Sequence, residues 1–212
     1  MSKDKVYIVK HTILTSMEEI EKAIVKDSTR ILTPKLYFKL KEHLTPEYIC
    51  MCDVLLHTGM RMPEFIRFSK HPEWYDARRR CIELPTEAIR KKKTAYKTRQ
   101  VNLTLEGCRA VEHFNKMIKD NMNIPSRQAM LGVLCRAAVA ADLPEGDRGI
   151  SPKMFRKTLV SWLMKSMPEK MFEIAGNMGH TLVVMQTNYT NLSFARDDLD
   201  DIRKFLKGWG EA

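Results

Sequence analysis

Long apolar runs are missing from this 212-residue sequence. None approaches the roughly 20 residues that a helix needs to cross a bilayer. The N-terminal stretch MSKDKVYIVKHTILTS also lacks the continuous apolar core of a secretory signal. We therefore expect a soluble, intracellular (cytoplasmic) protein with no membrane partner. Internal repeats and low-complexity tracts are missing too, so nothing favours a repeat architecture.

Cysteine is scarce and irregularly spaced. The chain has five cysteines, an odd number that argues against a disulfide framework. Cys50 and Cys52 form the only close pair, and no second pair of Cys or His stands at the spacing of metal ligands. We interpret both as buried thiols and expect neither a metal nor another cofactor.

Acidic residues are outnumbered. Lys and Arg total 36 against 26 Asp and Glu, which gives a formal net charge of +10. This excess favours a polyanionic partner such as nucleic acid, although a solvated basic surface would show it as well. With 44% hydrophobic residues, the chain is long enough for one substantial core, or for one domain and a small appendage.

Helical patterns dominate, and the predicted fold class is mainly α with a small antiparallel β-sheet (α+β). A capping box at Thr15 predicts a short helix through about Val25. Strands at 81–84 and 100–104 flank a basic segment, which suggests an exposed hairpin. The other predicted helices cover 34–43, 46–57, 105–121, 127–141, 152–166, the stretch from Pro168 to just before Gly176, a segment containing Tyr189, and an amphipathic tail over 197–209.

Arg61 stands on a predicted tight turn. Gly59 ends one helix and Pro63 opens the next, so the guanidinium between them is rigidly mounted. By itself, this segment fits an ordinary surface pair between Arg61 and Glu64 equally well.

Lys153 and Arg156 lie in the first turn of another predicted helix, three residues apart and on one face. Two cations at a helix N-terminus are electrostatically unfavourable unless an anion binds there. A phosphate would remove the conflict. A basic, solvated helix start is the alternative interpretation.

Together these residue types suit the chemistry of a phosphodiester. The forks of Arg61 and Arg156 can hold non-bridging oxygens bidentately without a metal. Lys93, in the basic segment, can protonate a leaving 5′ oxygen if neighbouring cations lower its pKa, and Lys97 is the second choice. Tyr189 must lose its proton to attack, since a free phenol has a pKa of about 10, and surrounding positive charge favours that loss.

The ordered motifs resemble the tyrosine recombinase (phage-type integrase) family. They are TGxRxxE at 58–64, the lysine at 93 followed by RxVxL at 99–103, RxT at 156–158, and Gly-His at 179–180 with a tyrosine nine residues after the histidine. Four segments in the family's order make a specific signal, although any one alone would be weak. The similarity covers roughly residues 15–207, which is essentially the family's catalytic domain.

The resemblance implies roles for the matched positions. Tyr189 would be the nucleophile that forms a 3′-phosphotyrosyl bond and frees a 5′ hydroxyl. Arg61 and Arg156 would clamp the scissile phosphate, Lys93 would protonate the leaving oxygen, and His180 would hydrogen-bond the phosphate. Glu64 would support the first arginine by hydrogen bonding. The basic residues expected to contact the DNA backbone are Lys91, Lys92, Lys97, Arg99 and Lys157.

Three departures from the family pattern are present. Lys153 stands where the family usually has histidine, so it is either a phosphate ligand or, with a lowered pKa, a base. Lys157 stands where histidine is also more usual. The third departure is length, because too few residues precede the third helix to form the family's separate N-terminal clamp domain.

We expect an N-terminal extension over 1–14, a catalytic domain over 15–196 and a C-terminal amphipathic helix within 197–212. That helix either docks on a neighbouring protomer or packs on its own core. The implied function is a site-specific recombinase or integrase of a mobile element, virus or plasmid, acting on double-stranded DNA as a homo-tetramer. Two alternatives stay open: a DNA-binding protein that kept the fold without turnover, and a relaxation activity like that of type IB topoisomerases.

Overall fold

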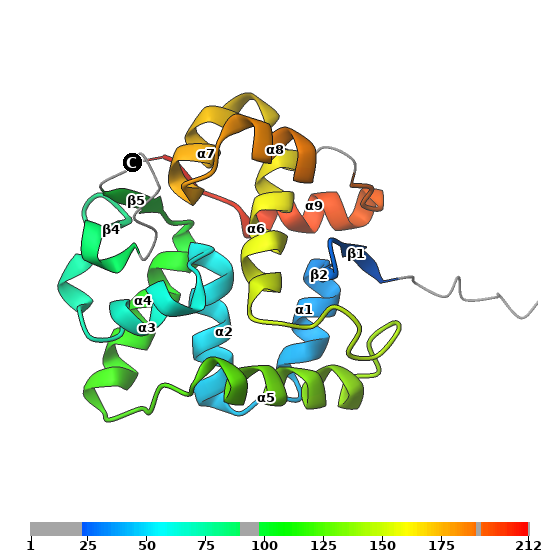
Figure 1. The fold of residues 1–212 in the computed structure, drawn as a ribbon, viewed down its shortest axis with the longest axis horizontal. Helices are drawn as coiled ribbons and strands as arrows, with labels where there is room; N and C mark the ends of the chain where they lie inside the picture. Colours follow the sequence, from blue (N-terminus) through cyan, green and yellow to red (C-terminus); the bar gives the residue numbers. More distant parts are fainter. Residues whose placement is uncertain (1–22, 90–97, 190–191, 212) are drawn as a thin grey trace, which may run out of the picture.

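The computed structural model describes residues 23–89, 98–189 and 192–211. Helix α6 (Lys153–Ser166) runs through the middle of the molecule and packs against α2 (Pro46–Thr58) (Figure 1). Within these residues, no helix is both long enough and apolar enough to span a membrane. The other helices are α1 (Pro34–Lys41), α3 (Met62–Phe68), α4 (Leu105–Lys119), α5 (Arg127–Ala140), α7 (Met171–Met178), α8 (Leu182–Tyr189) and α9 (Arg196–Phe205), with short 3-10 turns at Pro72–Trp74, Thr86–Ala88 and Pro168–Lys170.

Two small antiparallel sheets complete the fold, which is mainly α as predicted. Strand β1 (Ile24–Lys26) pairs with β2 (Thr29–Ile31), and β4 (Cys81–Leu84) pairs with both β3 (Tyr75–Asp76) and β5 (Arg99–Asn102). The predicted pairing of the two strands that flank the basic segment is thereby confirmed, with Leu84 opposite Arg99. The predicted hairpin tip, residues 90–97, lies outside the described residues.

The helix predicted to run to residue 25 is wrong at its described end. Residues there form β1, and Asp27 and Ser28, with φ of 47° and 54°, turn the chain into β2. The fully buried Arg30 ties this hairpin to the 144–149 loop, since its amide and its guanidinium both donate to carbonyl oxygens there. At this described end, tertiary contacts therefore outweigh the helical pattern.

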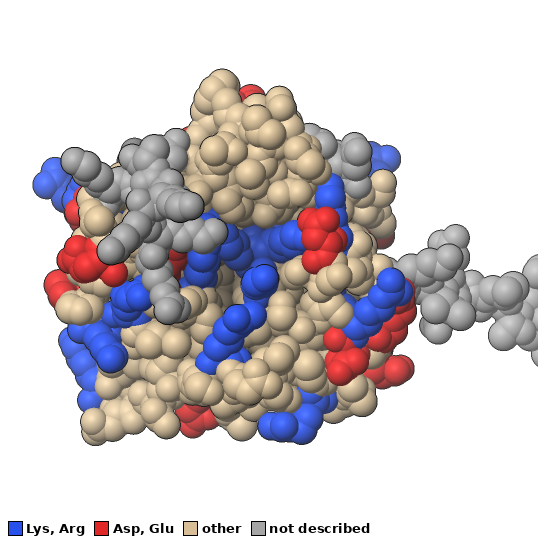
Figure 2. Space-filling view, in the orientation of Figure 1, with Lys and Arg blue, Asp and Glu red and all other residues tan. Residues whose placement is uncertain are grey.

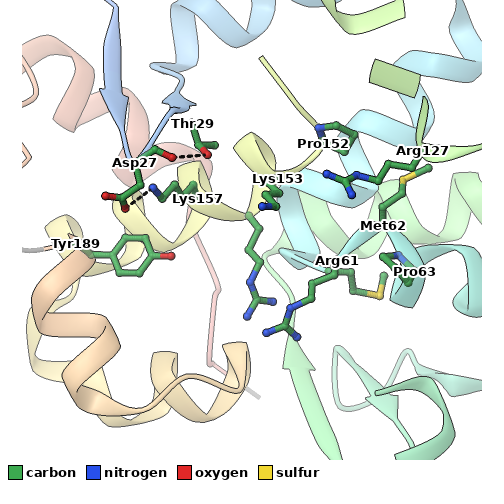
Figure 3. A pocket seen from close by; sticks show the side chains of 12 residues that line it. Asp27, Thr29, Arg61, Met62, Pro63, Arg127, Pro152, Lys153, Lys157 and Tyr189 are labelled. Atoms are coloured by element: carbon green, nitrogen blue, oxygen red, sulfur yellow. Dashed lines mark hydrogen bonds and ion pairs between the residues drawn. The ribbon is translucent and has the colours of Figure 1, made fainter. Parts of the chain in front are cut away.

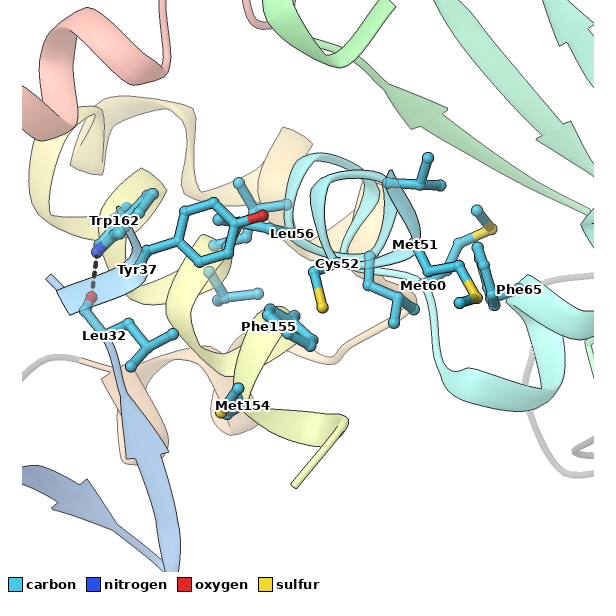
Figure 4. Close-up of a cluster of buried hydrophobic side chains, with 14 of the residues drawn as sticks. Leu32, Tyr37, Met51, Cys52, Leu56, Met60, Phe65, Met154, Phe155 and Trp162 are labelled. Carbon is cyan, nitrogen blue, oxygen red and sulfur yellow. Dashed lines mark hydrogen bonds between the residues drawn. The ribbon is translucent and has the colours of Figure 1, made fainter. Parts of the chain in front are cut away.

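The hydrophobic core lies between α2 and α6 and the elements around them (Figure 4). Phe155 and Trp162 of α6 are fully buried, and the Trp162 indole donates to the carbonyl oxygen of Leu32 at 2.9 Å. Burying such a side chain contributes about 1.5–3 kcal/mol. Cys50 and Cys52 are buried, unpaired thiols of α2, which confirms the prediction made for them.

The C-terminal helix packs on its own chain. Helix α9 contacts α1 and α6, and Ile202, Leu206 and Trp209 are fully buried. Its acidic residues come early and its basic residues late, as the helix dipole favours. The tail thus covers the core of its own chain, and docking on a neighbouring protomer stays a prediction.

Candidate active site

Arg61 occupies the turn between α2 and α3, where Gly59 ends the first helix with φ 58°. The Arg61 amide donates to Glu64 Oε2 and its Nη1 donates to Glu64 Oε1, both at 2.8 Å. The Glu64 side chain is 3% exposed and that of Arg61 38%. A buried carboxylate thus fixes an arginine whose side chain also lines a cleft.

Gly59 has little room for a side chain. A Cβ there would lie 3.0 Å from Met178 Sδ and 3.1 Å from Leu159 Cδ2. In Gly146, φ is also 58°, but nothing lies within 4 Å of the corresponding Cβ. A left-handed backbone costs an L-residue about 1–2 kcal/mol, so Gly59→Ala and Gly146→Ala should both lose about that much stability. In urea titrations we expect Gly59→Ala to lower the free energy of unfolding more than Gly146→Ala does. Equal losses in the two variants would contradict this packing argument.

Arg156 is held by the C-terminal ends of two helices. It is 8% exposed; Nη1 donates to the carbonyl oxygen of Gly59 at 2.8 Å and Nη2 to that of Met178. These oxygens lie where the α2 and α7 dipoles place partial negative charge. Burial lowers the pKa of Arg156 to about 9, and the charges of Arg99 and Arg61 act in the same direction. Carbonyl oxygens at two helix ends thus offset the charge of this cation in the first turn of α6.

His180 follows Gly179, which ends α7 with φ 59°. The helix therefore continues beyond Gly176, before which the sequence pattern predicts its end. Its Nε2 lies 3.0 Å from Arg156 Nη2. Burial lowers the pKa of His180 to about 3, and the charges of Arg156, Arg61 and Arg99 act in the same direction. The imidazole is therefore neutral at physiological pH. Because Nε2 accepts from a guanidinium, the proton lies on Nδ1.

Tyr189 is the last residue of α8 and is 7% exposed. Its ring is nearly parallel to that of His180, with 6.1 Å between the ring centroids, and its hydroxyl points to the side where Arg61 lies (Figure 3). Burial raises the pKa of the phenol; Arg156 and Arg61 lower it, and Asp27 raises it. The expected help from positive charge is real, but burial outweighs it in this conformation.

Arg61, Arg156 and Tyr189 meet in one cleft of about 390 Å³. His180 does not line it but contacts Arg156. Arg61 enters from the turn before α3, Lys153 and Arg156 from α6, and Tyr189 from α8. Figure 2 shows Lys and Arg atoms across the middle of this face, below the largely uncharged surface at the α7–α8 end. Segments far apart in the sequence thus form a basic hollow with a phenol at its wall.

Other cleft residues carried no signal in the sequence. Asp27 and Thr29 line the cleft from the β1–β2 hairpin, and Arg127 lines it from the start of α5. Ser126 caps α5, so the start of this helix is predictable from the sequence. Its position beside the cleft is not. Only the tertiary fold brings these residues to the basic cluster.

Two residues expected to contact DNA are engaged inside the protein. The Arg99 side chain is 3% exposed and bonds to Glu64 and to the Met178 carbonyl, so it does not reach a phosphate in this conformation. Lys157 is 14% exposed and forms an ion pair with Asp27 at 2.8 Å. That carboxylate would compete with a phosphate for Lys157.

The remaining predicted basic residues, Lys91, Lys92, Lys93 and Lys97, lie outside the described residues. The ends of their segment are described: Arg67 of α3 donates to the carbonyl oxygen of Ala88 at 2.9 Å, and a Cβ on Gly179 would lie 3.4 Å from Arg99 Cδ. Across the described ranges, no group of three or more His, Cys, Asp or Glu side chains is placed to hold a metal ion.

The sequence matches no protein-family model and no curated protein, but the fold is similar to solved structures. A crystal structure of XerA recombinase aligns with a TM-score of 0.58 and 16% identity over 82% of this chain and 64% of that one. The Tn1549 transposon integrase in complex with circular intermediate DNA aligns with a TM-score of 0.59 and 17% identity over 84% of this chain and 68% of that one. This chain therefore has the fold of a tyrosine recombinase catalytic domain and spans less than two thirds of the XerA recombinase.

Proposed function

We propose that the protein is a tyrosine-type DNA strand transferase, a site-specific recombinase or integrase that cleaves and rejoins DNA. The observation that carries this proposal is the single cleft in which Tyr189, Arg61, Arg156 and Lys153 meet. The shared fold supports it, because one similar structure is an integrase in complex with DNA. The substrate is double-stranded DNA of a mobile element, and the active assembly is a homo-tetramer on that DNA.

In this mechanism the scissile phosphate binds between Arg61 and Arg156. The Tyr189 oxygen forms a bond to phosphorus as the bond from phosphorus to the 5′ oxygen breaks, which leaves a 3′-phosphotyrosyl link. The phenolic proton leaves to solvent, and Lys93 supplies a proton to the 5′ oxygen. Rejoining reverses these steps with a 5′ hydroxyl as the nucleophile.

The supports of the two arginines explain how they would stabilise the transition state. Arg61 is fixed by Glu64, and Arg156 by carbonyl oxygens at two helix ends. Donors held in place before the reaction need no reorganisation as charge develops on the phosphate oxygens. His180, neutral because it is buried, accepts from Arg156 through Nε2 and so helps to hold that guanidinium without adding charge. Lys153, exposed at the start of α6, contributes a positive charge to the phosphate.

Covalent trapping tests the proposed function. A pool of duplexes with random central sequence, a 5′ biotin and one nick in that centre would be incubated with the protein and captured after denaturation in detergent. Cleavage just upstream of the nick releases a short fragment, so rejoining fails and the adduct accumulates. We expect captured protein bound to a subset of sequences, and the recovered sequences then supply a defined substrate.

One observation favours a second function. Lys153 stands in the cleft where the family usually has histidine, which fits a DNA-binding protein that lacks turnover. Duplex binding with no adduct on nicked or supercoiled DNA would establish that alternative. Relaxation of supercoiled plasmid without strand exchange would instead indicate a topoisomerase-like activity.

The role of Lys93 makes a separate prediction. Lys93→Ala should slow cleavage by about 10²–10⁴-fold, because the leaving alkoxide loses its proton donor. A substrate with sulfur in place of the 5′ bridging oxygen should restore the rate, because a thiol with a pKa of about 8.5 leaves without a proton. Single-turnover cleavage of both substrates measures this. Lys97→Ala is the control, and a sulfur-rescued defect in that variant would transfer the role to Lys97.

A further inference from the structure

Arg99 joins the supports of the two arginines proposed to bind the phosphate. It begins β5 opposite Leu84, and its side chain is 3% exposed. Its Nη2 donates to Glu64 Oε2 at 2.7 Å, and its Nη1 donates to the carbonyl oxygen of Met178 at 3.0 Å. One planar guanidinium thus links α3 to the C-terminal end of α7.

Each acceptor of Arg99 also serves an arginine of the cleft. Glu64 accepts from the amide and from Nη1 of Arg61, and the Met178 carbonyl accepts from Nη2 of Arg156. A continuous hydrogen-bonded path therefore runs from one cleft arginine through Arg99 to the other. A shift of Arg99 would move both ends of that path.

The geometry needs a guanidinium at this position. Arginine donates in two directions from a rigid plane, whereas the ammonium of lysine is a compact point charge on a flexible stem. Arg99 also packs against the α7 terminus, since a Cβ on Gly179 would lie 3.4 Å from Arg99 Cδ. His180 follows directly, so this packing also bears on the placement of the imidazole.

We propose that Arg99 is a positioning residue that fixes the relative placement of the Arg61 and Arg156 guanidiniums and of His180. Its catalytic consequence rests on the proposed function. The proposal differs from a DNA contact, which the basic sequence around Arg99 had indicated. The two roles differ in measurable ways, because a positioning residue acts on the rate of bound substrate and a phosphate contact acts on affinity.

The first test compares Arg99→Gln and Arg99→Lys with Arg30→Lys. Arg30 is a matched control, because it is also fully buried and donates to the carbonyl oxygens of Pro144 and Arg148. With saturating amounts of the nicked duplex recovered by covalent trapping, the cleavage rate of Arg99→Gln should fall by about 10²-fold, the loss typical when catalytic groups are slightly misplaced. Arg99→Lys should retain an intermediate rate, and Arg30→Lys the wild-type rate once corrected for its folded fraction.

Affinity decides between the two roles. Fluorescence anisotropy with the same duplex should give Arg99→Gln an unchanged dissociation constant and an unchanged salt dependence. A lost phosphate contact would instead reduce the slope of log affinity against log salt by about one. That reduction, or a wild-type cleavage rate in Arg99→Gln, would overturn the proposal. If Arg99→Gln does not fold, the cleavage rate of Arg99→Lys decides, because lysine keeps the charge but not the planar fork: positioning predicts a reduced rate, and a wild-type rate would overturn the proposal.

A readout independent of cleavage uses the imidazole nitrogens. In ¹⁵N-histidine-labelled protein, the His180 signals, assigned by their loss in His180→Gln, report the contact between Nε2 and Arg156. The ¹⁵N resonances of His180 should shift in Arg99→Lys and stay unchanged in Arg30→Lys. Unchanged resonances in Arg99→Lys would overturn the proposal. This result stands even if the wild type forms no adduct, which would remove the proposed function alone.

Discussion

Tyr189→Phe should form no covalent adduct with DNA while binding duplex as tightly as the wild type. Phenylalanine keeps the ring that lies against His180 and removes only the oxygen that would attack phosphorus. The measurement is the amount of biotinylated DNA that migrates with the protein on a denaturing gel. Because the proposed chemistry has a single nucleophile, the expected loss is complete rather than partial.

Tyr75→Phe provides the matched control for this variant. The Tyr75 hydroxyl donates to Glu112 at 3.0 Å, and the residue does not line the cleft. It should form adduct at the wild-type rate. Adduct formed equally well by Tyr189→Phe would remove Tyr189 from the mechanism.

Arg61→Ala and Arg156→Ala should each cost about 10²-fold or more in cleavage with duplex binding largely intact, as expected for groups that act on developing charge. The two variants should differ in stability. Loss of Arg156 leaves the carbonyl oxygen of Gly59 without its side-chain donor, at a cost of about 1–3 kcal/mol for an unsatisfied group. The Met178 carbonyl keeps Arg99 as a donor. Arg61 is 38% exposed, so its removal separates catalysis from folding more cleanly.

Arg127→Ala is the control for both arginine variants, because Arg127 lines the same cleft without belonging to the proposed clamp. Single-turnover cleavage and anisotropy titrations on the same duplex give the comparison. We expect Arg127→Ala to weaken binding and to leave the rate at saturation near that of the wild type. Equal losses of binding and cleavage in the Arg61 and Arg156 variants would make them ordinary backbone contacts.

Much of the fold follows from local signals in the sequence. Thr33 before Pro34 and Thr45 before Pro46 mark the starts of α1 and α2, because capping and proline geometry act within a few residues. The β1–β2 hairpin did not follow. Its turn has two residues with positive φ and no glycine, and contacts of Arg30 with a distant loop hold it. Such contacts have no local signature.

For the cleft, too, some features follow from the sequence and others depend on long-range contacts. The order of motifs placed Arg61, Arg156 and Tyr189 as a set, and the structure brings their side chains to one cleft. The sequence could not show that Arg99 turns inward, because its partners Glu64 and Met178 lie far away along the chain. Nor could a side-chain pattern reveal that backbone carbonyls at two helix ends hold an arginine.

Mass spectrometry of the trapped adduct tests the central claim most directly. After nuclease and trypsin digestion, the peptide over residues 171–196, which contains one tyrosine, should carry a nucleotide through a 3′ phosphate. Fragmentation should place that mass on Tyr189. A nucleotide on any other residue, or wild-type protein that binds the duplex pool and yields no adduct, would contradict the account.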